Sequence, residues 1–394
     1  MKSYNKLNIK TLKTIFGLFI IGILFACASN TQLSNQNEND SQMSADSLIY
    51  NLKSGKISSQ TIIKLPKAKY HFHKENAFSR EYYISNHDQG DTKKSALIFE
   101  NLKNIVIDGQ GSEIILHDKM IAFSFINCEN IILKNFSIDY ALPTIRQIIV
   151  LEIDKKKNEI KVEIYPSGNY KIENNQLFFT GNSSVSKPQM AMAFKQNGRL
   201  AYMKSDLIFN PKSIQEISAD TLIIQGWEQI KDIEQADIFA LRDYSRPHPG
   251  IFISESKNIN ISNVKVHFAD GMGLLAQMTE NIYLNKFSVC LRKNDKRYFT
   301  TQADATHFSA CKGEIISKNG LYEAMADDAI NVHGTYLSLK NKVDKNTVQA
   351  QYMHPQTWGF KWAEIGDSVQ FIDSERMEII ENQVYTIKDI KAID

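Results

Sequence analysis

The chain has 394 residues, 43% of them hydrophobic and 23% charged, which is the composition of an ordinary foldable protein with room for two or three domains. Its formal net charge of +2 gives no strong field that would indicate nucleic acid or an acidic polymer as a partner. The 16 tyrosines and 21 phenylalanines, against 3 tryptophans, occur among many β-branched residues and favour β structure.

The N-terminus, residues 1–27, is typical of a secretory signal. Four lysines precede the apolar run "TIFGLFIIGILFA", which is too short to cross a bilayer comfortably. The motif "LFAC" resembles a bacterial lipobox and predicts a lipid at Cys27, hence an exported lipoprotein of the bacterial cell envelope whose membrane contact is this anchor alone. Simple cleavage, giving a periplasmic or secreted protein, is the alternative. Residues 28–45 are polar and predict a flexible tether.

A degenerate repeat follows the tether. Its copies place a polar pair before Asn or Gly, then Ile, then a second short apolar strand: "NLKNIVIDGQGSEIIL", "INCENIILKNFSIDY", "SESKNINISNVKVHF", "MTENIYLNKFSVCL" and "SACKGEIISKNGLY". Asn104 and Asn130 are 26 residues apart, and Asn258 and Asn281 are 23 apart. This period predicts a solenoid of parallel strands in which Asn adopts left-handed turns and forms side-chain ladders between coils.

Two stretches interrupt the repeat. Residues 141–245 contain hairpin-like strands such as "IIVLEIDKKKNEIKVEIYP", and residues 336–394 contain similar ones. The expected fold is therefore all-β: a right-handed parallel β-helix, with coils at 46–140 and 246–335, interrupted by inserted antiparallel β-barrel-like domains. The second of these domains looks incomplete, and no further coil follows it, which suggests a truncated version of a longer protein.

An acidic constellation lies within the second set of coils. Asp327 and Asp328 are adjacent in "YEAMADDAINVHG", and Asp304 precedes them by 23 and 24 residues, one period of the repeat. Equivalent positions on successive coils stack about 4.8 Å apart. We therefore expect Asp304 to lie over the pair, so that three carboxylates share one small area.

Three clustered carboxylates suit two kinds of site. A hard cation such as calcium takes several oxygen ligands. Glycoside hydrolysis uses a protonated carboxyl to donate to the leaving oxygen and ionised ones to activate water, and mutual repulsion can keep one of them protonated. The chain has no His-x-His or Cys-x-x-Cys metal spacing and no phosphate-binding glycine loop. We predict no metal and no cofactor.

The motifs "TQADATHFSACKGEI" and "DDAINVHG", with "FADGMGLLAQMTENIYLNKF" upstream, resemble glycoside hydrolase family 110, the bacterial exo-acting α-1,3-galactosidases. The resemblance runs from about Leu48 to the end of the chain. It implies an inverting hydrolase that removes terminal α-1,3-linked galactose from an oligosaccharide or glycoconjugate, of blood-group-B or linear type. By position, Asp327 resembles the general acid, while Asp304 and Asp328 resemble the pair that deprotonates water.

Four neighbours of the aspartates are candidate substrate-binding residues: Arg297, His307, Asn331 and His333. The first two flank Asp304 and could bond galactose, tune the carboxylates or simply hold the loop. Asn331 could equally belong to a turn ladder, and "RPHPG" at residues 246–250 is most simply a rigid junction.

Two rival functions stay open. A polygalacturonase-like β-helix hydrolase would also carry a lone Asp one coil before an Asp pair. A non-catalytic surface β-helix that binds glycans needs no acidic triad, so loss of activity on removing Asp327 would separate it from the enzymes.

Overall fold

The computed structural model describes residues 44–392 apart from four short stretches, 182–183, 199–205, 229–232 and 381. The predicted signal segment with Cys27, and the tether up to residue 43, lie outside the described residues. Among the helices that are described, none is long and apolar enough to span a membrane.

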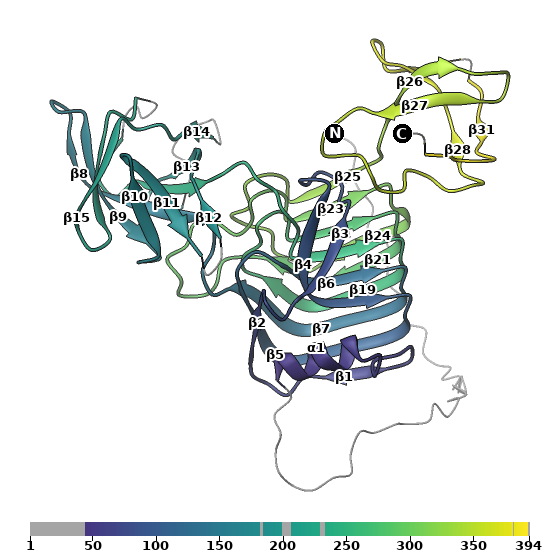
Figure 1. Cartoon of the computed structure of the whole chain (residues 1–394), viewed down its shortest axis with the longest axis horizontal. Coiled ribbons are helices and arrows are strands. Elements are labelled where there is room, and N and C mark those ends of the chain that lie inside the picture. The colour runs from purple at the N-terminus through teal and green to yellow at the C-terminus, as the bar shows by residue number, and fades with distance from the viewer. Residues whose placement is uncertain (1–43, 182–183, 199–205, 229–232, 381, 393–394) are drawn as a thin grey trace, which may run out of the picture. The chain divides into compact units, whose positions relative to one another are not determined.

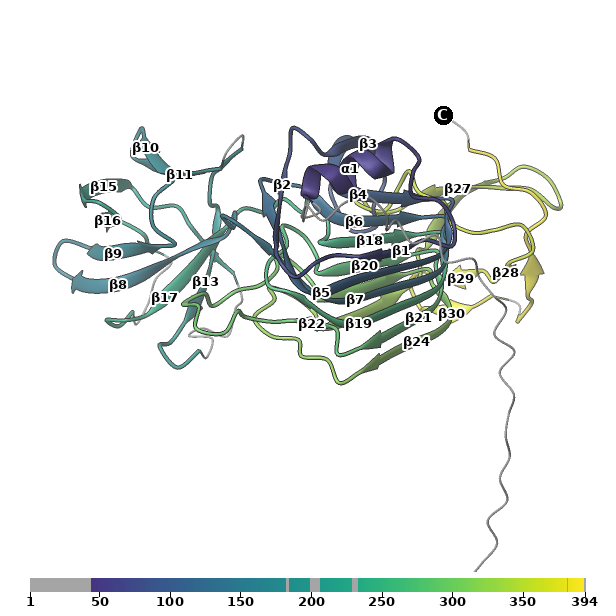
Figure 2. The same cartoon turned by 90° about the horizontal axis from the view of Figure 1, so that it is seen from below.

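Two stacked parallel sheets form the body of the molecule (Figures 1 and 2). The first, sheet A, contains β1 (Ile62–Lys64), β2 (Lys69–His73), β5 (Lys103–His117), β7 (Glu129–Tyr140), β19 (Lys257–Val266), β21 (Glu280–Asn285), β22 (Ser288–Val289) and β24 (Lys312–Lys318). The second, sheet B, contains β3 (Phe78–Tyr82), β4 (Asp91–Glu100), β6 (Ile121–Ile126), β18 (Ile251–Ser254), β20 (Leu274–Gln277), β23 (Thr306–Ser309) and β25 (Ile330–His333). All pairs are parallel except β3 with β4.

Each turn of the chain contributes one strand to each sheet, so equivalent residues stack along the solenoid. In sheet B one core column runs through Phe99, Phe125, Ile253, Ala276 and Phe308, none of which is more than 1% exposed. Burying such side chains supplies the main stabilisation of the coil stack. The predicted parallel β-helix interrupted by antiparallel β-domains is confirmed.

An asparagine ladder marks one corner of the coils. Asn104, Asn130, Asn258 and Asn281 all have φ between 56° and 60°. The amide Nδ2 of each later residue donates to the Oδ1 of the one before it, over 2.9 to 3.1 Å. The predicted left-handed turns and side-chain ladder are therefore confirmed.

A short helix, α1 (Ala45–Lys53), begins the described chain where the sequence led us to expect the end of the tether and the first coil. Ser44 caps it by accepting a bond from the Ser47 amide, and the buried Ala45, Leu48 and Ile49 lie on one face at helical spacing. These three join the main core, so α1 covers the first coils.

The first insertion separates β7 from β18. Its seven antiparallel strands are β8 (Arg146–Asp154), β9 (Glu159–Tyr165), β13 (Met190–Phe194), β14 (Leu207–Ile208), β15 (Ser213–Ser218), β16 (Thr221–Gln225) and β17 (Ile238–Arg242). A smaller sheet contains β10 (Tyr170–Glu173), β11 (Gln176–Thr180) and β12 (Val185–Ser186). This region has a hydrophobic core of its own, which includes Trp227.

The second region that interrupts the repeat follows β25 and consists of three antiparallel pairs of strands. These are β26 (Leu337–Lys342) with β27 (Val348–Tyr352), β28 (Ser368–Val369) with β31 (Tyr385–Thr386), and β29 (Ile372–Asp373) with β30 (Glu378–Ile379).

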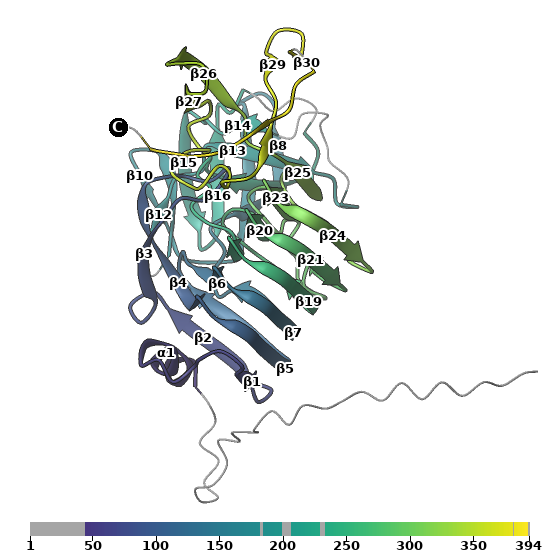
Figure 3. The same ribbon diagram turned by 90° about the vertical axis from the view of Figure 1, so that its right-hand side faces the viewer.

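β25 is the last strand of the coil stack, beside β23 (Figure 3). β25 pairs with β23 and forms one edge of sheet B. Val332 continues the core column above Phe308, yet it is 59% exposed.

Candidate active site

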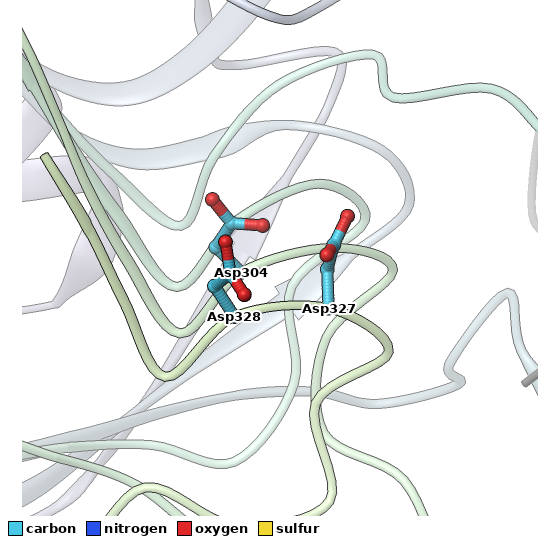
Figure 4. A group of neighbouring side chains, drawn as sticks. All are labelled: Asp304, Asp327 and Asp328. Atoms are coloured by element: carbon cyan, nitrogen blue, oxygen red, sulfur yellow. The ribbon is translucent and has the colours of Figure 1, made fainter. Parts of the chain in front are cut away.

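The turns that lead into the strands of sheet B carry the acidic residues. Asp304 precedes β23, and Asp327 and Asp328 precede β25. The register pairs Thr306 with Ile330, which sets Asp304 opposite Asp328 one coil away, and the Ala305 amide donates to the Asp328 carbonyl over 2.8 Å. The predicted stacking is confirmed, and Figure 4 shows Asp304 above Asp328 with Asp327 to one side.

The three carboxylates are close but differ in burial. One carboxylate oxygen of each lies within 4.8 Å of those of the other two. Asp304 is only 2% exposed, whereas Asp327 and Asp328 are exposed. Like charges this close repel and favour protonation of one member of the group.

Each carboxylate has its own hydrogen-bond donor. His307 Nδ1 lies 2.6 Å from Asp304 Oδ2. Arg246 donates from Nη2 to Asp327 Oδ2 over 3.2 Å, and Asn331 donates from Nδ2 to Asp328 Oδ2 over 2.9 Å. Each of these bonds satisfies one carboxylate oxygen, and Arg246 is the partner with a fixed positive charge.

Burial and charge act together on Asp327. Burial raises the pKa of its carboxyl, the charges of Asp304 and Asp328 raise it further, and Arg246 opposes them. The raised pKa shifts Asp327 toward the protonated form, which is the state that a general acid needs.

Two histidines stand behind Asp304. His307 is 1% exposed, and its Nε2 lies 2.7 Å from His333 Nε2, so both of its ring nitrogens have protein partners. Because both nitrogens are occupied, His307 is placed to orient the carboxyl group of Asp304 rather than to bond a sugar hydroxyl. Asn331 likewise bonds a carboxylate rather than joining a turn ladder.

Arg297 lies outside this constellation. Its guanidinium is buried and donates to both oxygens of Asp139, over 2.9 and 2.8 Å, and to Asp295. None of these bonds reaches the three aspartates. The expectation that Arg297 flanks Asp304 for sugar binding is not supported, because a buried arginine is held by the carboxylates that neutralise it.

The sequence reasoning missed Arg246, which it took for part of a rigid junction. Arg246 lies in the segment that leads into β18, five residues before the strand begins, and its guanidinium pairs with Asp327. Its backbone amide donates to Asp88 Oδ2 over 3.0 Å, which fixes its approach. A search for polar residues shortly before every sheet B strand would have found it.

Asp270 and His87 form a buried polar layer beneath the site. Asp270 is 2% exposed, accepts a bond from Thr144, and burial raises its pKa to about 6. His87 is fully buried against Gly271, where a Cβ would come within 2.4 Å of its Nε2. The hydrogen bonds of Asp270 and His87 go to Thr144 and to the Ser85 carbonyl, respectively, and not to the three aspartates.

The contacts of Trp358 and Trp362 are with residues other than the three aspartates. Trp358 packs on Tyr83 with ring centroids 5.5 Å apart, and Trp362 Nε1 donates to the Thr335 carbonyl over 2.6 Å.

Two family models match the interrupting regions. Residues 146–231 match GLAA-B beta-barrel domain I, and residues 347–394 match GLAA-B beta-barrel domain II. The first covers most of the insertion between β7 and β18, and the second covers most of the region after β26.

Curated relatives match along most of the chain. A protein of Parabacteroides distasonis named alpha-1,3-galactosidase B is 47% identical over 84% of this chain and 55% of its own length. A Phocaeicola vulgatus protein of the same name is 46% identical over 84% of this chain and 56% of its own length. Alpha-1,3-galactosidase A of Bacteroides thetaiotaomicron is 30% identical over 76% of this chain and 53% of its own length.

The chain therefore spans about half the length of the curated relatives it matches. The aligned part includes the β-helix and the first insertion, and thus the turns that carry the aspartates. These matches confirm the resemblance: over most of its length the chain is similar to curated α-1,3-galactosidases, and it matches both GLAA-B beta-barrel domains.

Proposed function

We propose that this protein is an exo-acting glycoside hydrolase that removes terminal α-1,3-linked galactose from glycans by a single displacement with inversion. The observation that carries the proposal is the meeting of three carboxylates on successive coils, one oxygen of each within 4.8 Å. The names of the relatives support an α-1,3 glycosidic bond as the bond that is cleaved and galactose as the sugar that is released.

In this proposal Asp327 is the general acid. Its raised pKa supports this role, and its exposure leaves it accessible to a glycosidic oxygen. Asp304 and Asp328, stacked one over the other, position a water molecule and remove its proton. His307 Nδ1, 2.6 Å from Asp304 Oδ2, orients this carboxyl group.

Inversion rests on the resemblance rather than on the spacing of the carboxylates. Acid and base carboxyl groups of inverting enzymes generally stand about 6.5–9.5 Å apart, and retaining pairs about 5–5.5 Å. Here the nearest oxygens are within 4.8 Å. Inversion requires water to attack the anomeric carbon from the face opposite the leaving oxygen, so the water held by Asp304 and Asp328 and the carboxyl of Asp327 must lie on opposite sides of that carbon.

The cellular setting is also proposed. The lipobox-like "LFAC" supports attachment of a lipid at Cys27 and a place in the bacterial cell envelope, with a galactose-terminated oligosaccharide or glycoconjugate as the partner. Labelling with a radioactive fatty acid, in the parent and in a Cys27→Ala variant, would test the anchor: label that persists in the variant would contradict it.

The rivals are separated by one assay on the purified protein. α-1,3-Galactobiose, α-1,4-galactobiose and polygalacturonate are incubated with the parent and with Asp327→Asn, and the released sugar is measured. Release of galactose from the α-1,3 substrate alone supports the proposal. Cleavage of polygalacturonate would favour the polygalacturonase-like hydrolase, and binding of galactosides without any release would favour a non-catalytic glycan-binding β-helix.

A further inference from the structure

We propose that His307 and His333 form a proton relay that carries the proton taken up by Asp304 to the surface of the protein. The inference rests on the proposed hydrolase function, in which Asp304 is part of the base. It assigns to the two histidines a positioning and proton-transfer role behind the reacting carboxylate.

The three side chains form one continuous chain of hydrogen bonds. Asp304 Oδ2 lies 2.6 Å from His307 Nδ1, and His307 Nε2 lies 2.7 Å from His333 Nε2. His333 Nδ1 lies 2.7 Å from the carbonyl oxygen of Gly334. The imidazole rings meet edge to face, with centroids 4.7 Å apart.

The number of hydrogens in this chain sets its chemistry. Its three bonds need three hydrogens, and the last must sit on His333 Nδ1 because the Gly334 carbonyl only accepts. An ionised Asp304 with two neutral imidazoles carries only two. The three bonds therefore require one more proton than these groups carry. With that proton, the unit formed by Asp304, His307 and His333 has no net charge.

Burial gives the chain a direction. Asp304 and His307 are 2% and 1% exposed, so a proton taken from water at Asp304 has little direct contact with solvent. His333 is partly exposed. Burial also lowers the pKa of His333, so a proton that arrives there is released readily near neutral pH.

The neighbouring charged groups do not reverse the direction of proton transfer, which runs from Asp304 to His333. Asp304 favours a charged His333, whereas a charged His307 disfavours it. Below the pair, fully buried His87 has a pKa well below its usual value, because of burial first and of the nearby His307, His248 and Lys93 charges after it. His87 therefore stays neutral and does not compete for the proton. Asp327 and Asp328 accept bonds from Arg246 and Asn331, respectively.

The step balances with the proposed reaction. The water oxygen bonds to the anomeric carbon as the bond to the leaving oxygen breaks; one water proton goes to Asp304, and the Asp327 proton goes to the leaving oxygen. The enzyme is reset when the relay delivers one proton to solvent from His333 and Asp327 takes one proton from solvent. The relay thus restores the base without exposing it.

The kinetic test uses His333→Ala in the full chain, with His71→Gln, an exposed histidine of β2, as the control. Release of galactose from α-1,3-galactobiose is measured across pH and with added imidazole. We expect kcat to fall by about tenfold or more with little change in KM, and imidazole to restore it in a saturable way. Unchanged kcat, or a loss that imidazole does not restore, would overturn the relay.

A second measurement needs no activity. Nitrogen NMR of the histidine rings in the parent should show His307 and His333 titrating together, since coupled groups share their macroscopic steps. In Asp304→Asn both titrations should move. Independent titrations, or titrations that ignore this change, would refute the relay. An inactive parent with coupled titrations would overturn the hydrolase function and leave the proton chain standing.

Discussion

Two neighbouring coils contribute different carboxylates to this site. The β23 coil is closed: its Asp304 is 2% exposed and its core residue Phe308 is 1% exposed. The β25 coil is open: Asp327 and Asp328 are exposed, and Val332, in the same core column, is 59% exposed. Stacking alone would make Asp304 and Asp328 equivalent. Their partners make all three aspartates different, since Asp304 contacts His307, Asp327 contacts Arg246 and Asp328 contacts Asn331, and that difference supports separate acid and base roles.

The largest expected effects come from two single replacements, one of Asp304 in the β23 coil and one of Asp327 in the β25 coil. Asp304→Asn and Asp327→Asn should each lower kcat on α-1,3-galactobiose by about 100- to 10,000-fold, because each removes a proton-transfer group. On p-nitrophenyl α-galactoside, whose leaving group needs little protonation, Asp327→Asn should recover much of its rate and Asp304→Asn should not. Equal losses on both substrates would contradict the division of roles.

The second effect concerns stability. Phe308→Ala should cost about 3–5 kcal/mol in the free energy of unfolding, because it leaves a cavity in the closed coil. Val332→Ala, at the equivalent position of the open coil, should cost less than about 0.5 kcal/mol. Urea unfolding followed by circular dichroism measures both, and similar losses for the two variants would show that the β25 coil is as well packed as its neighbour.

The third effect is a shift in the pH dependence. Arg246 favours the ionised form of Asp327 and so holds down a pKa that burial raises. A general acid works while protonated, so activity is lost as pH rises through its pKa. Arg246→Gln should raise that pKa and move the basic limb of kcat/KM to higher pH. Arg246→Lys keeps the charge and should leave the limb closer to its original place; a shift to lower pH in the Gln variant would contradict Asp327 as the acid.

The smallest effect is expected on the open coil. Asn331 donates one bond to the exposed Asp328, and its loss should lower kcat only about two- to fivefold, since a solvent-accessible carboxylate can be hydrated instead. Steady-state kinetics of Asn331→Ala, beside Asn319→Ala in a ladder away from the site, would measure it. A loss as large as that of Asp304→Asn would mean that Asn331 contacts the substrate itself.

The stacking of the aspartates could be predicted because the coil period is local. A spacing of 23 to 24 residues and parallel pairing set which residues meet, whatever the rest of the chain does. The same holds for the asparagine ladder, whose turns depend only on the residue at each corner.

The partners of the aspartates could not be predicted in this way. Arg246 is 81 residues from Asp327 and returns to the site only after an inserted domain. Arg297 is close to Asp304 in sequence, yet its charge is neutralised by Asp139, 158 residues away. Such contacts follow from how an insertion and a loop pack on the coils, and no repeat pattern encodes that packing.

In the proposed function, these three carboxylates hydrolyse a terminal α-1,3-galactoside with inversion. Proton NMR of α-1,3-galactobiose during hydrolysis tests this most directly, recorded before the released galactose mutarotates. We expect loss of the α-galactosyl signal in the parent with β-galactose formed first, and no change with Asp304→Asn. First-formed α-galactose would contradict inversion, and equal turnover by the parent and Asp304→Asn would contradict the site itself.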